Sequence, residues 1–234
     1  SIGNNKPFVP INHLEAHVLS SFYNNEIKFP HLCLLITGGH TQIYLLESIE
    51  TIKLIGETLD DAVGEAFDKV AKILGLPYPG GHELEKQALN GDENSFKLPQ
   101  PLIKEENLNF SFSGLKTSIN LISKKNKIDD NLIKNVSASF QKCISNILIT
   151  KLSKAIYNIN CDQNISISVV GGVANNNYLK KCFKRFEKNN NITFVYPPKY
   201  MMNDNAAMIA WATIFKYLKL NDINFRASPR LKIN

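Results

Sequence analysis

Two histidines near the start of the chain have the spacing of a metal-binding pair. His13 and His17 are four residues apart, so on a helix they lie about 40° from one another around the axis and can ligate one ion. Glu15 lies about 200° from His13 and would point away from that ion. A zinc metalloprotease needs its general-base glutamate directly after the first histidine, so the pattern argues against a peptidase. The alternative is an ordinary polar or capping role for both histidines.

A third ligand has to come from elsewhere in the chain, and Asp204 is the best candidate. It lies in the segment Met-Asn-Asp-Asn-Ala-Ala, at the expected start of the last helix. An aspartate in that position could equally be an N-cap. With His13 and His17 it would form a shell of two imidazoles and a carboxylate that leaves positions open to a substrate. Such a shell suits Fe(II) or Zn(II), which ligand chemistry alone does not separate.

Two glycine-containing segments could bind an anion or a nucleotide. The first consists of Leu35, Ile36, Thr37, Gly38 and Gly39. Its glycines let backbone N–H groups approach a phosphate closely, although a simple hairpin turn is the alternative. In the second segment, Gly171 and Gly172 end a strand and a helix begins near Asn176. That arrangement suits a nucleotide held at a helix N-terminus, but by itself it is ambiguous.

A third group of candidates lies in the middle of the chain. Asp68 belongs to an expected helix whose interior glycine, Gly64, is costly there and suggests that something approaches closely. Gly81, in Tyr-Pro-Gly-Gly, and Glu85 could offer backbone and carboxylate contacts to hydroxyl groups. The alternative for these last two residues is a plain turn between helices.

The elements expected to position these residues alternate between helices and strands. Periodicity and terminus signals predict helices over residues 14–23, 58–74, following the segment 110–114, 129–157 (one or two helices), from about 176, and 204–218. β-Branched and apolar runs predict strands over residues 31–37, 41–46, 165–170 and 192–195. Asp60 and Asp61 are expected to open the second helix and Gly75 to close it. This succession is typical of the α/β class.

Length and composition set the broad class. The chain has 234 residues, 44% of them hydrophobic, which is enough to bury a core. Its apolar runs are far shorter than the ~20 residues that span a bilayer, and its opening residues lack a secretory signal pattern. We therefore expect an intracellular protein that makes no membrane contact. The four cysteines include no C-x-x-C pair and are expected to be reduced, mostly buried thiols.

The charge of the chain favours an anionic partner. The formal net charge is +6, which would promote contact with a polymer of phosphates. Scattered lysines such as Lys124, Lys125 and Lys127 contribute to the excess, and a solvated face is the alternative for them.

Seven motifs in a fixed order resemble the TsaD/Gcp/YgjD family from end to end. They are Asn-His-Leu-Glu-Ala-His, Ile-Thr-Gly-Gly-His-Thr-Gln, Asp-Asp-Ala-Val-Gly-Glu-Ala-Phe-Asp-Lys, Tyr-Pro-Gly-Gly, Phe-Ser-Phe-Ser-Gly-Leu-Lys-Thr, Gly-Gly-Val-Ala-Asn-Asn and Asp-Asn-Ala-Ala-Met-Ile-Ala. The resemblance implies an α/β, actin-like ATPase fold (ASKHA, sugar-kinase type) with a partial first lobe and a complete second lobe. On that basis residues 1–30 are a remnant of the first lobe with the metal-binding helix. Residues 31–220 form the nucleotide-binding lobe with a helical insertion at about 75–160, and residues 221–234 form a tail.

The resemblance also implies an acyltransferase. Its members transfer threonylcarbamoyl from threonylcarbamoyl-AMP to N6 of the adenosine adjacent to the anticodon, in tRNAs reading codons that begin with A. By position, His13, His17 and Asp204 match the metal ligands, with Fe(2+) the usual ion and Zn possible. The residues that match nucleotide and substrate contacts, for threonylcarbamoyl-AMP or an ATP-like ligand, are Leu35, Ile36, Thr37, Gly38, Gly39, Asp68, Gly81, Glu85 and Asn176.

The resemblance also implies binding partners, and the sequence differs from the family pattern at several positions. The resemblance implies tRNA, a TsaB-like paralogue and a TsaE-like ATPase as partners, in the cytoplasm. His82 stands where many relatives have proline, and the tail from Arg226 differs from the usual ending. We also expect this chain to lack the family's opening strand and Thr/Ser-rich phosphate loop. Two further functions therefore stay open: an ATPase or phosphotransferase of the same fold, or a non-catalytic scaffold of the modification complex.

Overall fold

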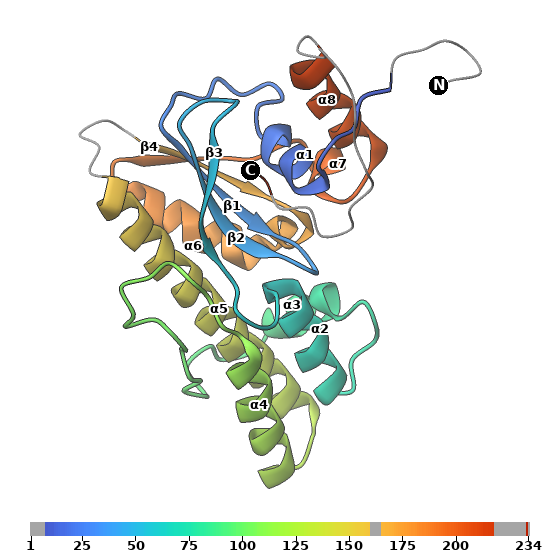
Figure 1. Ribbon diagram of the computed structural model, residues 1–234. Coiled ribbons are helices and arrows are strands. Elements are labelled where there is room, and N and C mark those ends of the chain that lie inside the picture. Colours follow the sequence, from blue (N-terminus) through green and yellow to red (C-terminus); the bar gives the residue numbers. More distant parts are fainter. Residues whose placement is uncertain (1–7, 160–164, 218–232, 234) are drawn as a thin grey trace.

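The computed structural model describes residues 8–159, 165–217 and 233, in which five strands form one sheet with helices on both faces (Figure 1). The strands are β1 (His31–Ile36), β2 (Thr41–Leu46), β3 (Ile52–Glu57), β4 (Ile165–Val170) and β5 (Ile192–Val195). The helices are α1 (His13–Ser20), α2 (Val63–Ile73), α3 (Gly80–Ala88), α4 (Ser113–Lys125), α5 (Asp130–Ile159), α6 (Asn177–Lys188), α7 (Lys199–Met202) and α8 (Ala206–Tyr217). A short 3-10 turn, η2, covers Gly172–Asn175.

Strand β1 lies in the middle of the sheet, whose order is β3-β2-β1-β4-β5. It pairs antiparallel with β2 and parallel with β4, and β4 pairs parallel with β5. In the β1–β4 pair, Leu32 lies opposite Ile167 and Leu35 opposite Val170. Both strands therefore end at the same edge of the sheet, which brings together residues that are far apart in the sequence.

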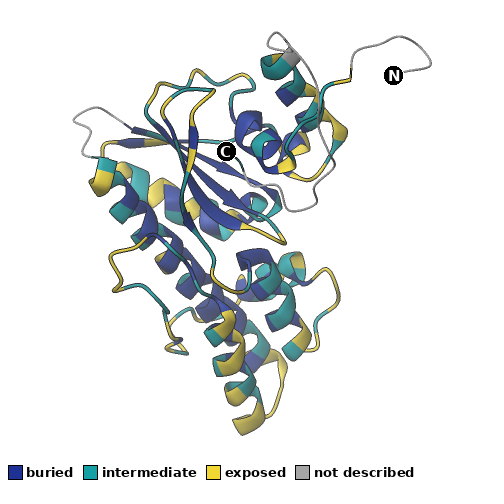
Figure 2. Ribbon diagram, viewed as in Figure 1, coloured by how far each residue is buried: buried dark blue, intermediate teal, exposed yellow. Residues whose placement is uncertain are grey.

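The two faces of β1 pack against different helices. Every residue of the strand is buried. Leu32, Leu34 and Ile36 belong to the large core formed with α2, α4, α5 and α6, whereas Cys33 and Leu35 belong to a smaller cluster with α1. A strand covered on both faces reads as a continuous apolar run, as this one does. Burial is densest in the sheet and the adjoining part of α5, and the far end of α4 is exposed (Figure 2).

A polar link crosses the β1–β4 pair inside the protein. His31 is fully buried, with Nδ1 2.6 Å from Ser166 Oγ and Nε2 2.9 Å from Ser168 Oγ, both on β4. Each hydroxyl can donate or accept, so a neutral imidazole is satisfied in either tautomer. Burial lowers the pKa of His31 to about 4. The side chain is therefore neutral at pH 7.

Most of the predicted elements are confirmed. The four predicted strands correspond to β1, β2, β4 and β5, and the first predicted helix to α1. The region 129–157 is a single helix, α5, and Asn176 caps α6 where a helix start was expected. Gly75 follows α2 with a φ of +73°, as expected of a residue that ends a helix.

The predicted start of the second helix was wrong. The helix begins at Val63, and Asp60 and Asp61 do not open it. Asp60 instead accepts a hydrogen bond from the N–H of Ser113, at the start of α4. The N–H of Val63 donates a hydrogen bond to Thr41 Oγ1 at 2.8 Å. Helix α2 is therefore capped by a side chain of strand β2.

Three helices and strands were not predicted: β3 at the sheet edge, α3, where a turn was expected, and the short helix α7. Cys33, Cys143 and Cys182 are free thiols, whereas Cys161 lies outside the described residues. The predicted tail, 221–234, also lies outside them apart from Ile233, and the predicted domain boundaries stay a prediction.

In the described part of the chain, no helix combines the length and apolar character needed to cross a membrane.

Acid should weaken the fold through His31. Its pKa is about 4 when folded and about 6.5 when unfolded, so the unfolded chain binds more protons between these values and stability falls as the pH drops from 6.5 toward 4. From pH 7 to pH 5, the free energy of unfolding should fall by about 2 kcal/mol more in the wild type than in His31→Gln. Urea denaturation at both pH values measures this. The same pH dependence in both proteins would contradict the assignment.

Candidate metal and nucleotide site

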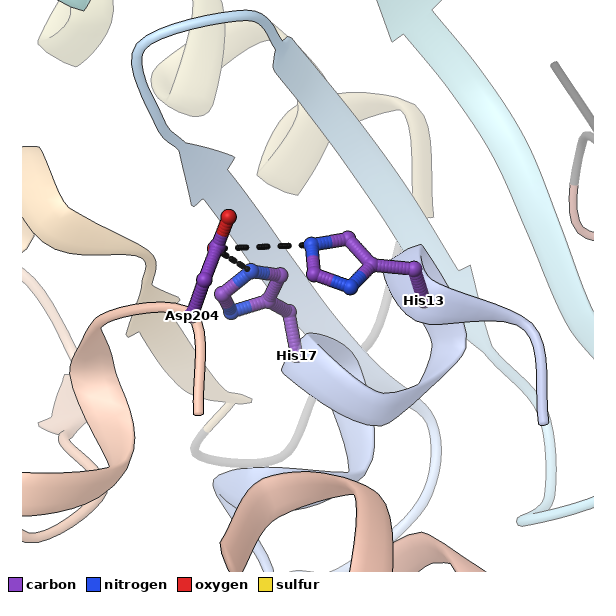
Figure 3. Close-up of side chains that lie close together, drawn as sticks. All are labelled: His13, His17 and Asp204. Carbon is purple, nitrogen blue, oxygen red and sulfur yellow. Dashed lines mark hydrogen bonds and ion pairs between the residues drawn. The ribbon is translucent and has the colours of Figure 1, made fainter. Parts of the chain in front are cut away.

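Helix α1 presents His13 and His17 side by side. Asn12 caps the helix, because its side chain accepts hydrogen bonds from the N–H groups of Leu14 (2.9 Å) and Glu15 (3.2 Å). The side chain of His17 is fully buried, whereas half of the His13 side chain is exposed. The two rings meet edge to face with centroids 4.9 Å apart (Figure 3). One imidazole thus lies inside the protein and the other beside it at the surface.

Asp204 reaches the same point from the segment between α7 and α8. Its Oδ1 lies 2.9 Å from His17 Nε2 and 3.4 Å from His13 Nε2, as Figure 3 shows, and the ligand atoms of all three residues lie within 4.8 Å of one another. Metal–ligand bonds of about 2.1 Å put neighbouring ligand atoms about 3.0 Å apart in an octahedral shell and about 3.4 Å apart in a tetrahedral one. The separations fit such a shell. The three residues grouped by sequence therefore lie together, while metal binding stays a prediction.

Burial also affects the charge of the His17 ring. Burial lowers the pKa of His17 and outweighs the hydrogen bond to Asp204, which acts in the opposite direction. A neutral ring with its proton on Nε2 donates to Asp204 Oδ1, whereas a neutral ring with its proton on Nδ1 has a lone pair on Nε2 that can ligate a cation. Among the described residues, the buried Nδ1 has no hydrogen-bond partner, so no second hydrogen bond fixes the ring.

Helix α8 packs along α1 and sets the distance from the histidines to Asp204. Ala16 and Leu19 of α1 are buried against Met208 and Ala212 of α8. The indole N–H of Trp211 donates to the backbone oxygen of Leu19 at 2.9 Å. The segment that holds Asp204 thus leads into a helix that is in direct contact with the helix of the two histidines.

Two side chains near the triad have other roles than ligation. Glu15 Oε2 lies 2.7 Å from Lys216 Nζ on α8, so this carboxylate points away from the triad, as predicted. The N-cap of α8 is Asn205, whose Oδ1 accepts a hydrogen bond from the N–H of Met208 at 3.0 Å. The capping role considered for Asp204 therefore belongs to its neighbour, and the Asp204 carboxylate is left facing the histidines.

The triad opens into a cavity of about 430 Å³ at the edge where β1 and β4 end. The cavity is lined by His13, Leu14, His17, Thr37, Gly38, Gly39, His40, Gly172, Asn203 and Asp204. Its size is within the range of pockets that bind small molecules. Two of the glycine-containing segments singled out in the sequence thus meet at the triad.

The turn between β1 and β2 exposes bare backbone to this cavity. A Cβ atom at Gly38 or Gly39 would meet nothing within 4 Å, so packing does not require glycine there and its absence of a side chain leaves room for a ligand. The N–H groups of Gly39 and His40 donate to Thr37 Oγ1 at 3.2 and 2.9 Å. An anion that binds these amides would have to compete with the Thr37 hydroxyl.

The first turn of α2 packs directly against that turn. The N–H of Gly64 donates to Thr37 O at 3.2 Å, and a Cβ at Gly64 would lie 2.6 Å from Thr37 O and 2.8 Å from Gly38 Cα. At Gly171, where φ is +95°, a Cβ would lie 2.5 Å from Ile36 O. The close approach inferred from Gly64 is confirmed, and the approaching segment is the turn that lines the cavity.

Three residues of the cavity, Leu14, His40 and Asn203, were absent from the predicted site. Burial lowers the pKa of His40, and the neighbouring His13 lowers it further, which favours a neutral ring. Asn203 lies against Gly172, where its Oδ1 would be 2.9 Å from a Cβ. Each residue adjoins a predicted one in the sequence, and this adjacency is the signal that could have found them.

Other predicted nucleotide contacts lie in a second region, where α2, α3 and α6 meet. Asp68 Oδ1 accepts a hydrogen bond from the N–H of Gly80 at 2.8 Å, and Glu85 Oε1 accepts one from the N–H of Asn177 at 2.6 Å. Asn176 is the buried N-cap of α6. None of these described residues lines the cavity of the triad, and Asp68 lines a separate one of about 580 Å³. Their polar groups join the three helices, and nucleotide binding by them stays a prediction.

The remaining residues predicted to contact a nucleotide or substrate are Leu35, Ile36 and Gly81. Leu35 and Ile36 are fully buried in β1, so they could reach a ligand only with main-chain atoms. Gly81 lies in the first turn of α3, where a Cβ would meet Phe67 Cβ at 3.9 Å, an ordinary contact. Packing therefore does not demand glycine at this position.

The architecture defines the class of protein. A solved structure of full-length HypF, in a phosphate- and nucleotide-bound form, has a TM-score of 0.69 and 13% identity over 93% of this chain and 37% of that chain. At 13% identity, the similarity between the two structures is evidence for a shared fold alone. The chain has the actin-like ATPase (ASKHA) fold, as predicted.

Sequence comparison then gives the family. The family described as TsaD, tRNA N6-adenosine threonylcarbamoyltransferase, matches residues 1–211. The protein of that name from Wolbachia pipientis wMel is 42% identical over 233 residues, which are 97% of this chain and 68% of the relative. Its counterpart from Rickettsia bellii (strain OSU 85-389) is 45% identical over 217 residues, 91% of this chain and 64% of the relative. The chain therefore belongs to the TsaD family of transferases, and it spans about two thirds of the length of these relatives.

Filling the space at Gly64 should disturb the turn that lines the cavity. In Gly64→Ala the free energy of unfolding should fall by about 1–3 kcal/mol, because the new methyl group meets backbone atoms, although alanine gains up to about 1 kcal/mol over glycine in a helix. Urea denaturation measures this. The matched control is Gly114→Ala in α4, where the nearest atom to a Cβ is Pro101 Cγ at 3.6 Å, and it should be neutral or stabilising. A Gly64→Ala protein as stable as this control would refute the argument.

Proposed function

We propose that this chain carries the metal- and nucleotide-binding part of an enzyme that modifies tRNA. The enzyme transfers threonylcarbamoyl from threonylcarbamoyl-AMP to N6 of the adenosine adjacent to the anticodon, in tRNAs that read codons beginning with A. Membership in the TsaD family supports the reaction. The observation that carries the proposal is the convergence of His13, His17 and Asp204 at a cavity that also contains the Thr37–Gly39 turn.

The triad would hold one divalent cation, Fe(2+) or Zn(2+). Two imidazole nitrogens and one carboxylate oxygen leave coordination positions open toward the cavity, and this donor set suits either ion. When bound, such an ion polarises a carbamoyl or phosphate oxygen and stabilises negative charge on it. His17, which is fully buried, would fix the ion from the protein side. The more exposed His13 and Asp204 would complete the shell at the cavity wall.

The chain's own residues would act by orienting the reactants. In the transfer, N6 of adenosine forms a bond to the carbamoyl carbon, the bond from that carbon to the AMP oxygen breaks with its electron pair leaving on AMP, and N6 loses a proton. The cavity lining contains no serine, cysteine or lysine among the described residues, so no covalent intermediate is proposed. The open backbone at Gly38 and Gly39 gives the phosphate room to approach. Positioning and electrostatics would supply the rate enhancement.

Partners and location follow from the same family analogy. We propose tRNA as the acceptor, with a TsaB-like paralogue and a TsaE-like ATPase as protein partners. The formal net charge of +6 supports contact with the tRNA backbone. A tRNA-modifying role also favours the cytoplasm as the place of action.

Removal of any triad ligand should abolish tight metal binding. Changes outside the first coordination sphere already cost 10–100-fold in affinity, so His13→Ala, His17→Ala or Asp204→Ala should weaken Co(2+) binding by more than about 100-fold. Co(2+) accepts the same donors, and its visible absorption reports binding during titration. His82→Ala removes an exposed histidine of α3 outside the cavity and should bind as the wild type does. Equal affinities for all four variants would refute the metal assignment.

Transfer itself should depend on the same residues. The full chain, combined with the proposed partners, threonylcarbamoyl-AMP and tRNA, should yield modified adenosine that mass spectrometry of the digested nucleosides detects. Asp204→Ala should be at least about 100-fold slower because it loses the metal that stabilises the leaving charge. His82→Ala should be as fast as the wild type.

Two outcomes would replace the proposal. ATP hydrolysis that needs no tRNA and survives the double substitution His13→Ala/His17→Ala would indicate an ATPase or phosphotransferase. A folded chain that binds no ATP in equilibrium dialysis and modifies no tRNA would indicate a scaffold.

A further inference from the structure

Helix α6 carries a row of positive charges along its exposed side. Lys181, Lys184, Arg185 and Lys188 are all exposed and follow the spacing i, i+3, i+4 and i+7, which places them on one face of a helix. The opposite face is buried, with Leu179 and Phe183 in the core. The row is therefore a surface feature and takes no part in packing.

Within the described residues, none of these four cations forms an ion pair, whereas Lys53, Lys69, Lys142 and Lys216 each pair with a carboxylate. The one acidic residue of α6, Glu187, is partly buried, and it adds to the effect of burial in raising the pKa of Tyr196. None of the four like charges therefore has an ion-pair partner in the described chain.

The helix dipole accounts for only part of the row. Cations are favoured in the last turn of a helix, and Arg185 and Lys188 lie there. Lys181 and Lys184 lie earlier, where the dipole gives little stabilisation. A polyanionic partner explains all four, because each cation can neutralise a phosphate and release a counterion.

The helix that carries the row begins close to the candidate site. Strand β4 leads through Gly171 and Gly172 into η2, and α6 follows directly with Asn176 as its N-cap; Gly172 lines the cavity of the triad. From Lys181 to Lys188 the helix rises about 10 Å, so the four cations form a row that can contact several neighbouring phosphates of one strand. An RNA whose reacting base occupies the cavity would be long enough to follow this helix.

An exposed aromatic residue lies near the end of the neighbouring helix α5. Helices α5 and α6 contact one another, and both end at the sheet edge where β4 and β5 begin side by side, with Ile165 opposite Ile192 (Figure 1). Tyr157, near the end of α5, is 84% exposed. Unpaired bases of RNA stack on such rings, whereas an acidic protein would not require one.

We propose that the exposed side of α6, together with Tyr157, is the surface on which the tRNA backbone docks. This inference rests on the proposed function, which supplies tRNA as the acceptor. Lys181, Lys184, Arg185 and Lys188 contact phosphates, so they contribute affinity without reading the sequence. Tyr157 stacks on an unpaired base.

The test compares two sets of four charges. Lys181→Gln/Lys184→Gln/Arg185→Gln/Lys188→Gln should bind labelled tRNA at least tenfold more weakly in fluorescence anisotropy, and the slope of log affinity against log salt should fall by about 3–4, about one for each phosphate contact. The control changes the same number of exposed cations at α4 and its end: Lys116→Gln, Lys124→Gln, Lys125→Gln and Lys127→Gln. Its slope should stay close to that of the wild type. Circular dichroism checks that both proteins are folded.

A second variant tests the stacking residue. Tyr157→Ser should weaken tRNA binding at least fivefold, as expected for the loss of one stacked base, and should leave the salt slope unchanged. Equal losses in the α6 and α4 variants, or no loss in either, would overturn the docking surface, as would a wild-type chain that binds no tRNA. Failure of the proposed function looks different, because tRNA would then bind through α6 while no threonylcarbamoyl is transferred.

Discussion

The parallel pairing of β1 with β4 is the contact on which the rest of the structure depends. It brings the turn after β1 and the glycines after β4 to one edge of the sheet, although the two strands are far apart in the sequence. Gly171 makes the junction possible, since its φ of +95° and missing side chain let β4 end against Ile36 O. At the other end of the pair, His31 links the strands through two serine hydroxyls. The same strand pair therefore lies at the centre of the core and ends at the candidate site.

Features encoded by short-range patterns could be predicted from the sequence. The continuous apolar run of β1 indicated a strand buried on both faces, which it is. The spacing of His13 and His17 indicated two imidazoles on one side of a helix, and they are neighbours in the structure. Glycine is unfavourable inside a helix, so Gly64 indicated that another segment approaches this helix closely. That segment is the turn at Thr37. Asp204 was chosen as the third ligand from its residue type and its place before the last helix, and the family resemblance supported that choice, because no local pattern relates residues so far apart.

Two helix starts, those of α2 and α3, could not be predicted, because their caps come from distant parts of the chain. The first N–H groups of α2 and α3 are bound by Thr41 and Asp68 respectively. No local window contains both partners, so Asp60 resembled the cap of the helix that follows it in the sequence. The Tyr-Pro-Gly-Gly segment resembled a turn for the same reason, although α3 begins within it. Asp68 and Glu85 thus serve the fold, and a nucleotide that binds them would share these carboxylates with helix N-termini.

The contact between α1 and α8 has a consequence for the three donor atoms. Two of them belong to α1 and the third precedes α8, and the helices pack through a cluster that includes the completely buried Ala16 and Ala212. Interhelix distance follows the size of the side chains at the contact. The spacing of the donors, and with it the ionic radius that they can enclose, consequently depends on small buried side chains that never touch the ion.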